Sequence, residues 1–248
     1  MFNVKISLVT ITYNAAATIQ RCITSVVNQS YTNVEYIVID GNSGDGTQQI
    51  IHQYKSHIHF FKSEPDLGIY DAMNKGISFC TGDVIGMLNA DDYLDNEHVL
   101  SEIASSFMQH DTDLLYADLD YVNPKGKVLR KWRSGHYQHH KFNWGWMPPH
   151  PTFYVKRKLF EQFGLYNFNY GTAADYELML RFMYLHQAKV FYLNKVIVKM
   201  ASGGVSNQNF KNRVRAWKND FRAMKDNRIK RPIIGICLKP LRKIAQFV

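Results

Sequence analysis

Residues 34–47 have the sequence VEYIVIDGNSGDGT, in which a run of β-branched residues leads straight into a glycine-rich polar loop. The apolar run over 34–40 predicts a strand that is buried on both faces of a sheet. The loop over 41–46 ends this strand, and Thr47 is a residue type that caps helices. A buried strand, a polar loop and a helix in this order are typical of α/β sheets.

The same order recurs on both sides of this stretch. The predicted strands cover residues 6–13, 34–40, 58–63, 84–88 and 113–122, and the predicted helices cover residues 15–29, 47–54, 71–79 and 97–109. This alternation predicts a Rossmann-like α/β fold, a mostly parallel sheet with helices on both faces.

The pattern changes after residue 122. The turn residues at 123–126 predict a hairpin, and residues 135–151, rich in His, Trp and Pro, predict irregular loops. Later segments are predicted as helices over 156–163 and 174–185, a strand over 190–200 and a basic helical stretch from Asn207. With no internal repeat and no linker-like stretch, we expect one domain over 1–206, in halves 1–122 and 123–206, with a helical extension over 207–248.

The positive charge of the chain is concentrated at its end. The chain has 30 Lys and Arg against 21 Asp and Glu, a net charge of +9, and residues 211–248 hold 12 of the basic residues and two of the acidic ones. The other 210 residues therefore carry 18 basic and 19 acidic groups and are nearly neutral. A basic tail on a neutral body favours an anionic membrane surface over nucleic acid as a partner, and the mixed apolar and basic residues of 230–243 are the predicted contact. For the first part of the tail, a helix packed on the body with a solvated basic side is the better interpretation.

Composition narrows the expected location. No apolar run approaches the roughly 18 residues that a membrane span needs. Cys22, Cys80 and Cys237 are scattered without a CxxC pair, which fits a reducing compartment, and the first residues lack the pattern of a secretory signal. We expect a cytoplasmic protein, peripheral on the cytoplasmic face of the inner membrane if the tail binds lipid.

Four predicted strands deliver polar residues to one edge of the sheet, which is where ligands bind in open α/β folds. These segments are 12–14, 40–47, 66–68 and 89–92. The adjacent carboxylates of Asp91 and Asp92 repel each other unless a cation relieves them, and such oxygen ligands suit Mg²⁺ or Mn²⁺ together with phosphate oxygens. The alternative is that Asp92 or Asp95 caps the next helix.

These residues together resemble a known family. The segments VTITYN (9–14), IDGNSGDGT (39–47) and LNADD (88–92) are similar to the signatures of family 2 glycosyltransferases of the GT-A fold. EPDLGIYDAMNKG (64–76) resembles a subset that builds bacterial surface polysaccharides of the colanic acid or O-antigen type, ADYE (174–177) with Arg181 resembles the motif that supplies the catalytic base, and GGVS (203–206) resembles a loop after the last core strand. The acidic motif often begins with Asp, and here Asn89 stands in that place.

The resemblance implies an inverting transfer of a sugar from a nucleotide-diphosphate sugar, with a UDP-sugar as the first choice, to a hydroxyl of a lipid-linked saccharide. The first half of the domain would bind the donor, with Mn²⁺ or Mg²⁺, and the second half the acceptor. Asp175 is the candidate catalytic base, because the attacking hydroxyl must lose its proton; its alternative role is an acid at a helix N-terminus. Glu177 and Arg181 are four residues apart and predict a helix salt bridge.

The remaining site residues follow from the same resemblance. The expected nucleotide-binding residues are Thr12, Tyr13, Asn14, Asp40, Ser43, Asp66, Asn89 and Ala90; the expected metal ligands are Asp91, Asp92 and His150; and the expected acceptor-binding residues are Trp144 and Trp146. Ordinary packing is the alternative for Tyr13, for the two tryptophans and for His150.

Two other functions compete with this one. A nucleotidyltransferase that makes the sugar nucleotide should carry a Gly-rich, basic triphosphate loop after the first strand, and residues 12–17 have neither Gly nor a cation. A catalytically degenerate nucleotide-sugar-binding module would not need Asp91, Asp92 and Asp175 together.

Overall fold

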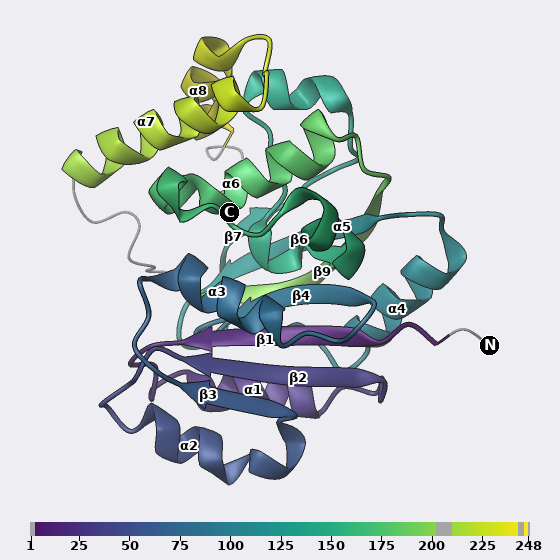
Figure 1. The fold of residues 1–248 in the computed structure, drawn as a ribbon, viewed down its shortest axis with the longest axis vertical. Helices are drawn as coiled ribbons and strands as arrows, with labels where there is room; N and C mark the ends of the chain where they lie inside the picture. Colours follow the sequence, from purple (N-terminus) through teal and green to yellow (C-terminus); the bar gives the residue numbers. More distant parts are fainter. Residues whose placement is uncertain (1–2, 202–209, 243–245, 248) are drawn as a thin grey trace.

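The computed structural model describes residues 3–201, 210–242 and 246–247, which form one α/β unit around a nine-stranded sheet (Figure 1). The strands are β1 (Ile6–Thr12), β2 (Val34–Asp40), β3 (Phe60–Ser63), β4 (Val84–Asn89), β5 (Tyr93–Leu94), β6 (Leu114–Val122), β7 (Val128–Trp132), β8 (Tyr154–Lys156) and β9 (Val190–Ala201). The helices are α1 (Ile19–Val27), α2 (Thr47–Gln53), α3 (Ile69–Ser78), α4 (Val99–Gln109), α5 (Arg157–Phe163), α6 (Ala174–Met179), α7 (Phe210–Asp226) and α8 (Pro232–Leu241). Short turns of helix are η1 (Lys55–His57), η2 (His139–Trp144), η3 (His150–Thr152), η4 (Phe168–Ala173) and the π-turn η5 (Leu180–Leu185), which continues α6.

The strand order is β3-β2-β1-β4-β8-β6-β9-β5, with β7 paired to β6. Six strands, β1 to β4 with β6 and β9, run in one direction, whereas β5, β7 and β8 run against them. The predicted mostly parallel sheet is confirmed. The short strands β5 and β8 were not predicted, because two or three residues are too few to show a periodic pattern.

Helices cover both faces of the sheet, as the alternation predicted. Successive residues of β1 point to opposite faces, so that Leu8 packs in the same cluster as α1, α2 and α4, while Val9 packs in the same cluster as α3, α5 and α6. Gly76 allows α3 to lie directly on the sheet, since a Cβ atom there would come within 2.4 Å of Val9 Cγ1. This close approach fixes the start of α3 near the carboxyl ends of the strands.

The C-terminal helices pack on the second half of the domain (Figure 1). Ala223, Met224 and Ile229 are buried in the cluster that also contains α5 and α6. Gly145 and Gly235 let α8 approach η2 closely, because a Cβ on Gly145 would lie 2.3 Å from the Gly235 carbonyl oxygen. The predicted extension therefore shares a hydrophobic core with residues 123–206. The predicted boundary at 206/207 and the 203–206 loop lie outside the described residues, and no helix among the described residues is long and apolar enough to cross a membrane.

Candidate active site

The carboxyl ends of β1, β2 and β4 bring three of the predicted loops to one edge of the sheet. In the parallel register Thr12 lies opposite Asp40, and Ile11 lies opposite Asn89. The segments after these strands therefore begin side by side, although up to about 80 residues separate them along the chain.

The loops after β1 and β2 are hydrogen-bonded into one unit. The backbone N–H of Asn14 donates to Ser43 Oγ at 2.8 Å, and Asn14 Oδ1 accepts from the Gly44 N–H at 3.0 Å. Asn14 has a φ of 47°, a left-handed conformation that Asn tolerates better than most residues. The preceding side chain, Tyr13, is left 66% exposed at the rim of this unit, where it is free to stack on a planar ligand.

Asp40 is buried and serves the loop itself. Its carboxylate accepts hydrogen bonds from the Ser43 N–H at 3.0 Å, from Ser43 Oγ at 2.5 Å and from Ser63 Oγ at 2.6 Å. With no exposed surface, Asp40 has no free face for a base or ribose. Both side chains hold the glycine-rich loop, and their expected contact with the nucleotide stays a prediction.

Asp66 meets Tyr13 across the loop after β2. A Cβ atom on Gly41 would lie 2.6 Å from Asp66 Oδ2 and 3.2 Å from the Tyr13 ring, so both side chains line this glycine. Asp66 also accepts a hydrogen bond from the Gly68 N–H at 2.8 Å, which shapes the turn before α3. Tyr13 and Asp66 are thus both at the surface and adjacent, as a nucleotide site requires.

Two buried polar atoms at this edge have no hydrogen-bond partner among the described residues. They are Thr12 Oγ1 and Asn89 Oδ1, at the ends of the adjacent strands β1 and β4. An unpaired buried polar atom costs about 1–3 kcal/mol, so a ligand that pairs with it is favoured. Ala90, by contrast, is buried and its N–H donates to the Ile11 carbonyl, so its expected contact with the nucleotide stays a prediction.

Asp91 and Asp92 differ in environment although they are neighbours. Asp92 is fully buried and accepts hydrogen bonds from Asn89 Nδ2 at 3.0 Å and from the Ala201 N–H at 3.2 Å. Asp91 is half-buried, and Arg21 donates to its carbonyl oxygen at 3.3 Å. Burial raises the pKa of both carboxyls, and the charge of Asp91 raises that of Asp92 further. Asp92 therefore anchors the end of β9, whereas Asp91 is only half-buried and is the more accessible of the two carboxylates; the assignment of both as metal ligands stays a prediction.

The residues fit a cation that is held only partly by protein. Among the described residues no group of three or more His, Cys, Asp or Glu could hold a metal ion by itself. Among these described residues, no Lys or Arg forms an ion pair with the Asp91 carboxylate. A carboxylate whose pKa is raised by burial is stabilised as an anion by a divalent cation, and phosphate oxygens would supply the other ligands.

Asp175 lies at the start of α6, beside a tyrosine from α3. The Tyr70 hydroxyl donates to Asp175 Oδ1 at 3.2 Å, and the Tyr176 N–H donates to the same oxygen at 2.7 Å. Burial and then the Asp175 charge raise the pKa of Tyr70, so its hydroxyl stays protonated and remains a donor. Because α3 begins three residues after Asp66, this contact connects Asp175 to the nucleotide side of the edge.

His150 belongs to the Asp175 side of the site. Its Nε2 atom is hydrogen-bonded to the Tyr166 hydroxyl at 2.7 Å, and the Tyr166 ring stacks on Tyr70 with centroids 5.7 Å apart. Burial lowers the pKa of His150, and the Asp175 charge opposes this shift. The His150 ring thus packs against Tyr166 next to Asp175, and its assignment as a metal ligand stays a prediction.

Comparison with known proteins agrees with this geometry. The sequence profile of glycosyl transferase family 2 matches residues 7–187. This chain belongs to glycosyltransferase family 2. It is 27% identical over 210 residues to a PGL/p-HBAD biosynthesis glycosyltransferase of Mycobacterium bovis, covering 81% of this chain and 78% of that one.

Two solved structures show the same fold as this glycosyltransferase. TarS of S. aureus, solved as residues 1–349 with UDP, has a TM-score of 0.69 at 18% identity and covers 92% of this chain and 66% of that one. A mannosyltransferase of Pyrobaculum calidifontis, solved with GDP-Man and Mn²⁺, has a TM-score of 0.68 at 15% identity and covers 96% of this chain and 70% of that one. The expected GT-A fold is confirmed.

Trp144 and Trp146 both have packing roles in this glycosyltransferase. Trp146 is buried, donates from Nε1 to the Ser134 carbonyl at 2.9 Å and meets the Tyr116 ring edge-on. Trp144 is half-buried beside α8, where Arg231 stacks over its ring at 5.3 Å. These contacts match the packing alternative, and binding of the acceptor by the two rings stays a prediction.

Glu177 and Arg181 form the predicted helix salt bridge. Arg181 Nε and Nη2 contact the two Glu177 carboxylate oxygens at 3.0 and 2.9 Å, and Arg181 also donates to the Gly164 and Leu165 carbonyls. The pair ties α6 to the loop after α5 and so fixes the helix that carries Asp175.

Tyr121 of β6 lies at the same edge and was not predicted. Burial raises its pKa, the Arg130 charge opposes this, and the charges of both Asp92 and Asp175 raise it further. Its ring stacks parallel to Trp132 of β7, an arrangement that only the β6–β7 pairing creates.

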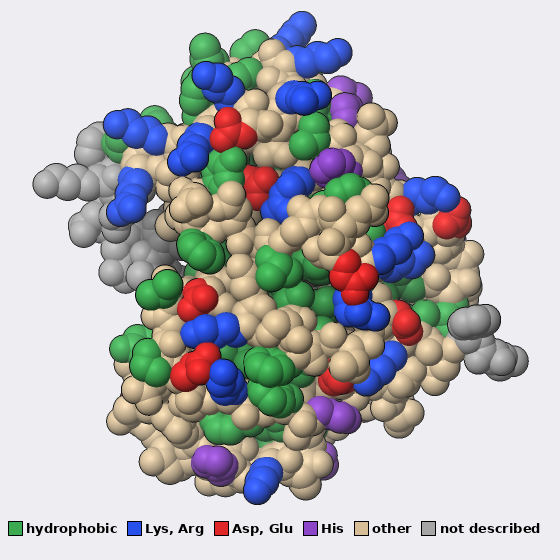
Figure 2. All heavy atoms as spheres, viewed as in Figure 1, with side chains coloured by type: hydrophobic (Ala, Val, Ile, Leu, Met, Phe, Trp, Pro, Cys, Tyr) green, Lys and Arg blue, Asp and Glu red, His purple; other side chains and the backbone are tan. Residues whose placement is uncertain are grey.

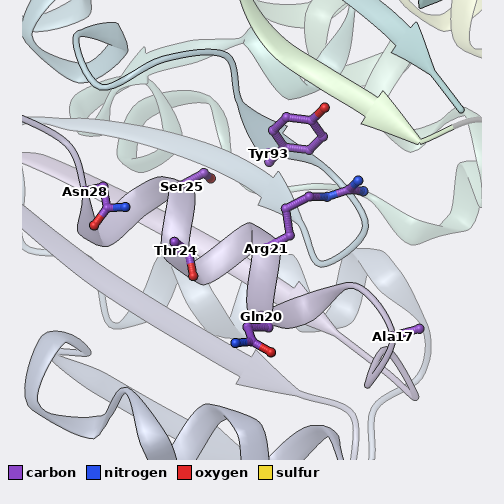
Figure 3. A pocket seen from close by; sticks show the side chains of 7 residues that line it. All are labelled: Ala17, Gln20, Arg21, Thr24, Ser25, Asn28 and Tyr93. Atoms are coloured by element: carbon purple, nitrogen blue, oxygen red, sulfur yellow. The ribbon is translucent and has the colours of Figure 1, made fainter. Parts of the chain in front are cut away.

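A shallow depression of about 440 Å³ lies behind the loop that carries Asp91 and Asp92 (Figure 3). It is lined by Ala17, Gln20, Arg21, Thr24, Ser25, Asn28 and Tyr93. Arg21 crosses it and stacks over the Tyr93 ring at 4.3 Å. The depression follows the outer side of α1. Its lining lies behind the loop that carries Asp91 and Asp92 and includes none of the candidate site residues described above.

Proposed function

We propose that this glycosyltransferase moves a sugar from a UDP-sugar to a hydroxyl group of a lipid-linked saccharide, with inversion at the anomeric carbon, in the assembly of a bacterial surface polysaccharide. The observation that carries the proposal is the placement of Asp175. Tyr70 of α3 binds it, α3 begins beside Asp66, and Asp66 adjoins Tyr13. The candidate base thus stands next to the open nucleotide side of the sheet edge.

The donor is proposed to lie across the ends of β1 and β4. The exposed Tyr13 ring would stack on the base, and Asp66 would accept a hydrogen bond beside it. Thr12 and Asn89, whose side-chain oxygens lack partners, would gain hydrogen bonds from the same ligand. Asn14 contributes through its backbone, by holding the loop that presents Tyr13.

Asp91 is the residue proposed to hold Mn²⁺ or Mg²⁺ together with the diphosphate. When bound, such a cation supplies Lewis-acid stabilisation of the leaving diphosphate. Asn89 is neutral and Asp92 is buried, so the half-buried Asp91 is the carboxylate that would receive the cation.

Asp175 is proposed to take the proton of the acceptor hydroxyl while that oxygen attacks the anomeric carbon. The new carbon–oxygen bond forms on the face opposite the breaking bond to the diphosphate, so the configuration inverts. The Tyr70 hydroxyl and the Tyr176 N–H hold Asp175 Oδ1. The other oxygen, Oδ2, is left to receive the proton.

A thermal-shift screen tests the donor site first. UDP, GDP, dTDP and CMP are added singly with and without Mn²⁺ or Mg²⁺, because a ligand of the folded state raises the unfolding midpoint by mass action. We expect the largest rise with UDP and metal, and its loss in Asp91→Ala.

The control for this screen is Asp111→Ala, which removes an exposed carboxylate that pairs with Lys189 away from the site. The donor-site proposal fails if no nucleotide shifts the midpoint at millimolar concentration. Retention of the UDP shift in Asp91→Ala would remove Asp91 from the site.

A further inference from the structure

One apolar stripe of α7 is only partly covered by its packing. Val214, Trp217, Phe221 and Met224 are spaced three, four and three residues apart, so they share one side of the helix. Met224 is buried at one end of this stripe. Val214, Trp217 and Phe221 remain exposed along the rest of it, and Trp217 is 51% exposed.

The outer side of α8 is also apolar. Gly235 faces inward against Met224, while Ile233, Ile234, Cys237 and Leu241 face outward. Ile233 is 67% exposed, although isoleucine is among the residues most often buried. Because α7 and α8 contact each other, their exposed apolar sides lie on neighbouring elements.

Basic side chains surround these apolar residues. The exposed ones are Arg215, Lys218, Arg222, Lys225, Arg228, Lys230, Arg231 and Arg242. The two acidic residues of this region are engaged within the protein, Asp220 with Lys239 at 2.8 Å and Asp226 with the Tyr170 hydroxyl at 2.8 Å. Figure 2 shows hydrophobic side chains lying among Lys and Arg at this end of the molecule.

We propose that the exposed sides of α7 and α8, here called the C-terminal face, bind the surface of an anionic lipid bilayer. Apolar side chains would enter the boundary between headgroups and acyl chains, and Lys and Arg would bind lipid phosphates. A second copy of the chain is a poorer partner, because two strongly basic faces repel each other. Nucleic acid would match the charge but would leave the aliphatic stripe unburied.

The position of this face fits the proposed reaction. α7 packs on η4 and on α6, and α6 carries Asp175 near its first residue. A bilayer on the C-terminal face would therefore be close to the acceptor side of the site. This orientation rests on the proposed function, whereas binding to lipid does not.

Vesicle flotation of the full chain, without donor or acceptor, tests the proposal. We expect the protein to float with phosphatidylglycerol-containing vesicles, and not with pure phosphatidylcholine vesicles. Brominated lipid should quench the fluorescence of Trp217, and Trp217→Phe should remove most of that quenching, because Trp146 is buried and Trp132 and Trp144 are half-buried.

Two variants separate the apolar and the charged contributions. Trp217→Ser with Ile233→Ser should weaken partitioning by at least about tenfold, since two exposed side chains lose their burial in lipid. Arg215→Gln, Lys218→Gln and Lys225→Gln together should weaken it by roughly 100-fold, at about fivefold for each basic residue. All these side chains are exposed, so the variants should keep the wild-type unfolding midpoint.

The matched controls are Met108→Ser, an exposed apolar residue of α4, and the triple change Lys55→Gln, Lys125→Gln and Lys127→Gln. The proposal is overturned if the wild type does not float, or if the controls weaken binding as much as the C-terminal variants. It is also overturned if the wild type is a dimer that Trp217→Ser with Ile233→Ser dissociates and neither form floats. Flotation without any nucleotide shift would leave this proposal standing and remove the proposed function.

Discussion

The carboxylates at the two ends of the parallel strands β1, β2 and β4 have pKa values shifted in opposite directions. At the amino end, burial tends to raise the pKa of Glu35, but hydrogen bonds from Ser7, Thr81 and Lys5 outweigh it and lower the pKa to about 2. At the carboxyl end, burial raises the pKa of Asp91 and Asp92. The same sheet thus holds one carboxylate stabilised as an anion and a pair that is not.

The difference shows how to separate structural acids from functional ones. Glu35 has all the donors it needs from the fold, and removing it should cost stability. Asp91 has few donors from the fold, so its charge is best stabilised by a ligand. A position at the carboxyl edge is not sufficient to identify a functional acid, because Asp40 lies there and is as fully hydrogen-bonded as Glu35.

The largest effect is expected for Asp175→Asn. Without a base for the acceptor hydroxyl, turnover should fall by a factor on the order of 10² or more, while the unfolding midpoint stays near that of the wild type. Steady-state assays with the donor identified by the thermal-shift screen measure this. Turnover close to wild type would mean that Asp175 only stabilises the start of α6.

Asp91→Asn should reduce turnover by a factor on the order of 10², because the cation is no longer held beside the leaving diphosphate. Stability should not fall, since a neutral amide removes the burial cost and the repulsion from Asp92. Metal-dependent UDP binding is measured by calorimetry, with Asp111→Asn as the control. A strong loss of stability with unchanged metal-dependent binding would place Asp91 in the same class as Glu35.

Glu35→Gln should destabilise the protein by about 2 kcal/mol at pH 7 and leave turnover unchanged. The pKa of Glu35 is lower in the folded protein than its ordinary value of 4.5, so its contribution is complete above pH 4.5 and is lost as the pH falls towards about 2. Denaturant unfolding at several pH values should show that the variant has a smaller loss of stability over this window. Identical pH dependence in both proteins would contradict the comparison.

Tyr70→Phe should lower turnover by roughly tenfold, the effect of one hydrogen bond to a charged group. Stacking of the ring on Tyr166 is kept, so stability should change little. The pH dependence of turnover distinguishes positioning from packing, because only loss of a donor to Asp175 moves the acid limb of the profile upward. Phe163→Leu, which alters packing near α6 without touching Asp175, should leave that limb in place.

Much of the fold could be predicted from local patterns. The strands that became β1, β2 and β4 are long apolar runs followed by polar loops, and a central parallel strand needs that composition because both its faces are covered. The Glu177–Arg181 pair was predictable for a similar reason, since four residues on a helix fix the distance between side chains. The starts of α3 and α4 were displaced by two residues, which reflects how weakly sequence marks helix ends.

The site residues were predicted less evenly. Tyr13, Asp66, Asp91 and Asp175 remain available to ligands, whereas Asp40, Ser43, Ala90, Asp92, His150 and the two tryptophans are used by the protein itself. Both groups contain the same residue types after the same kinds of strand. Sequence shows that a polar side chain reaches the edge, but only the packed structure shows how many of its hydrogen bonds are already made.

By itself, the sequence determined the family, the alternation of the long strands and helices, and the edge of the sheet where chemistry is expected, because motifs and hydrophobic periodicity are local patterns. Tertiary structure alone decided which carboxylates are left unsatisfied and that Tyr70 reaches Asp175 across 105 positions. It also decided that the basic tail packs on the domain and turns an apolar side outward. Burial and hydrogen-bond saturation arise from segments far apart in the chain, so no local pattern encodes them.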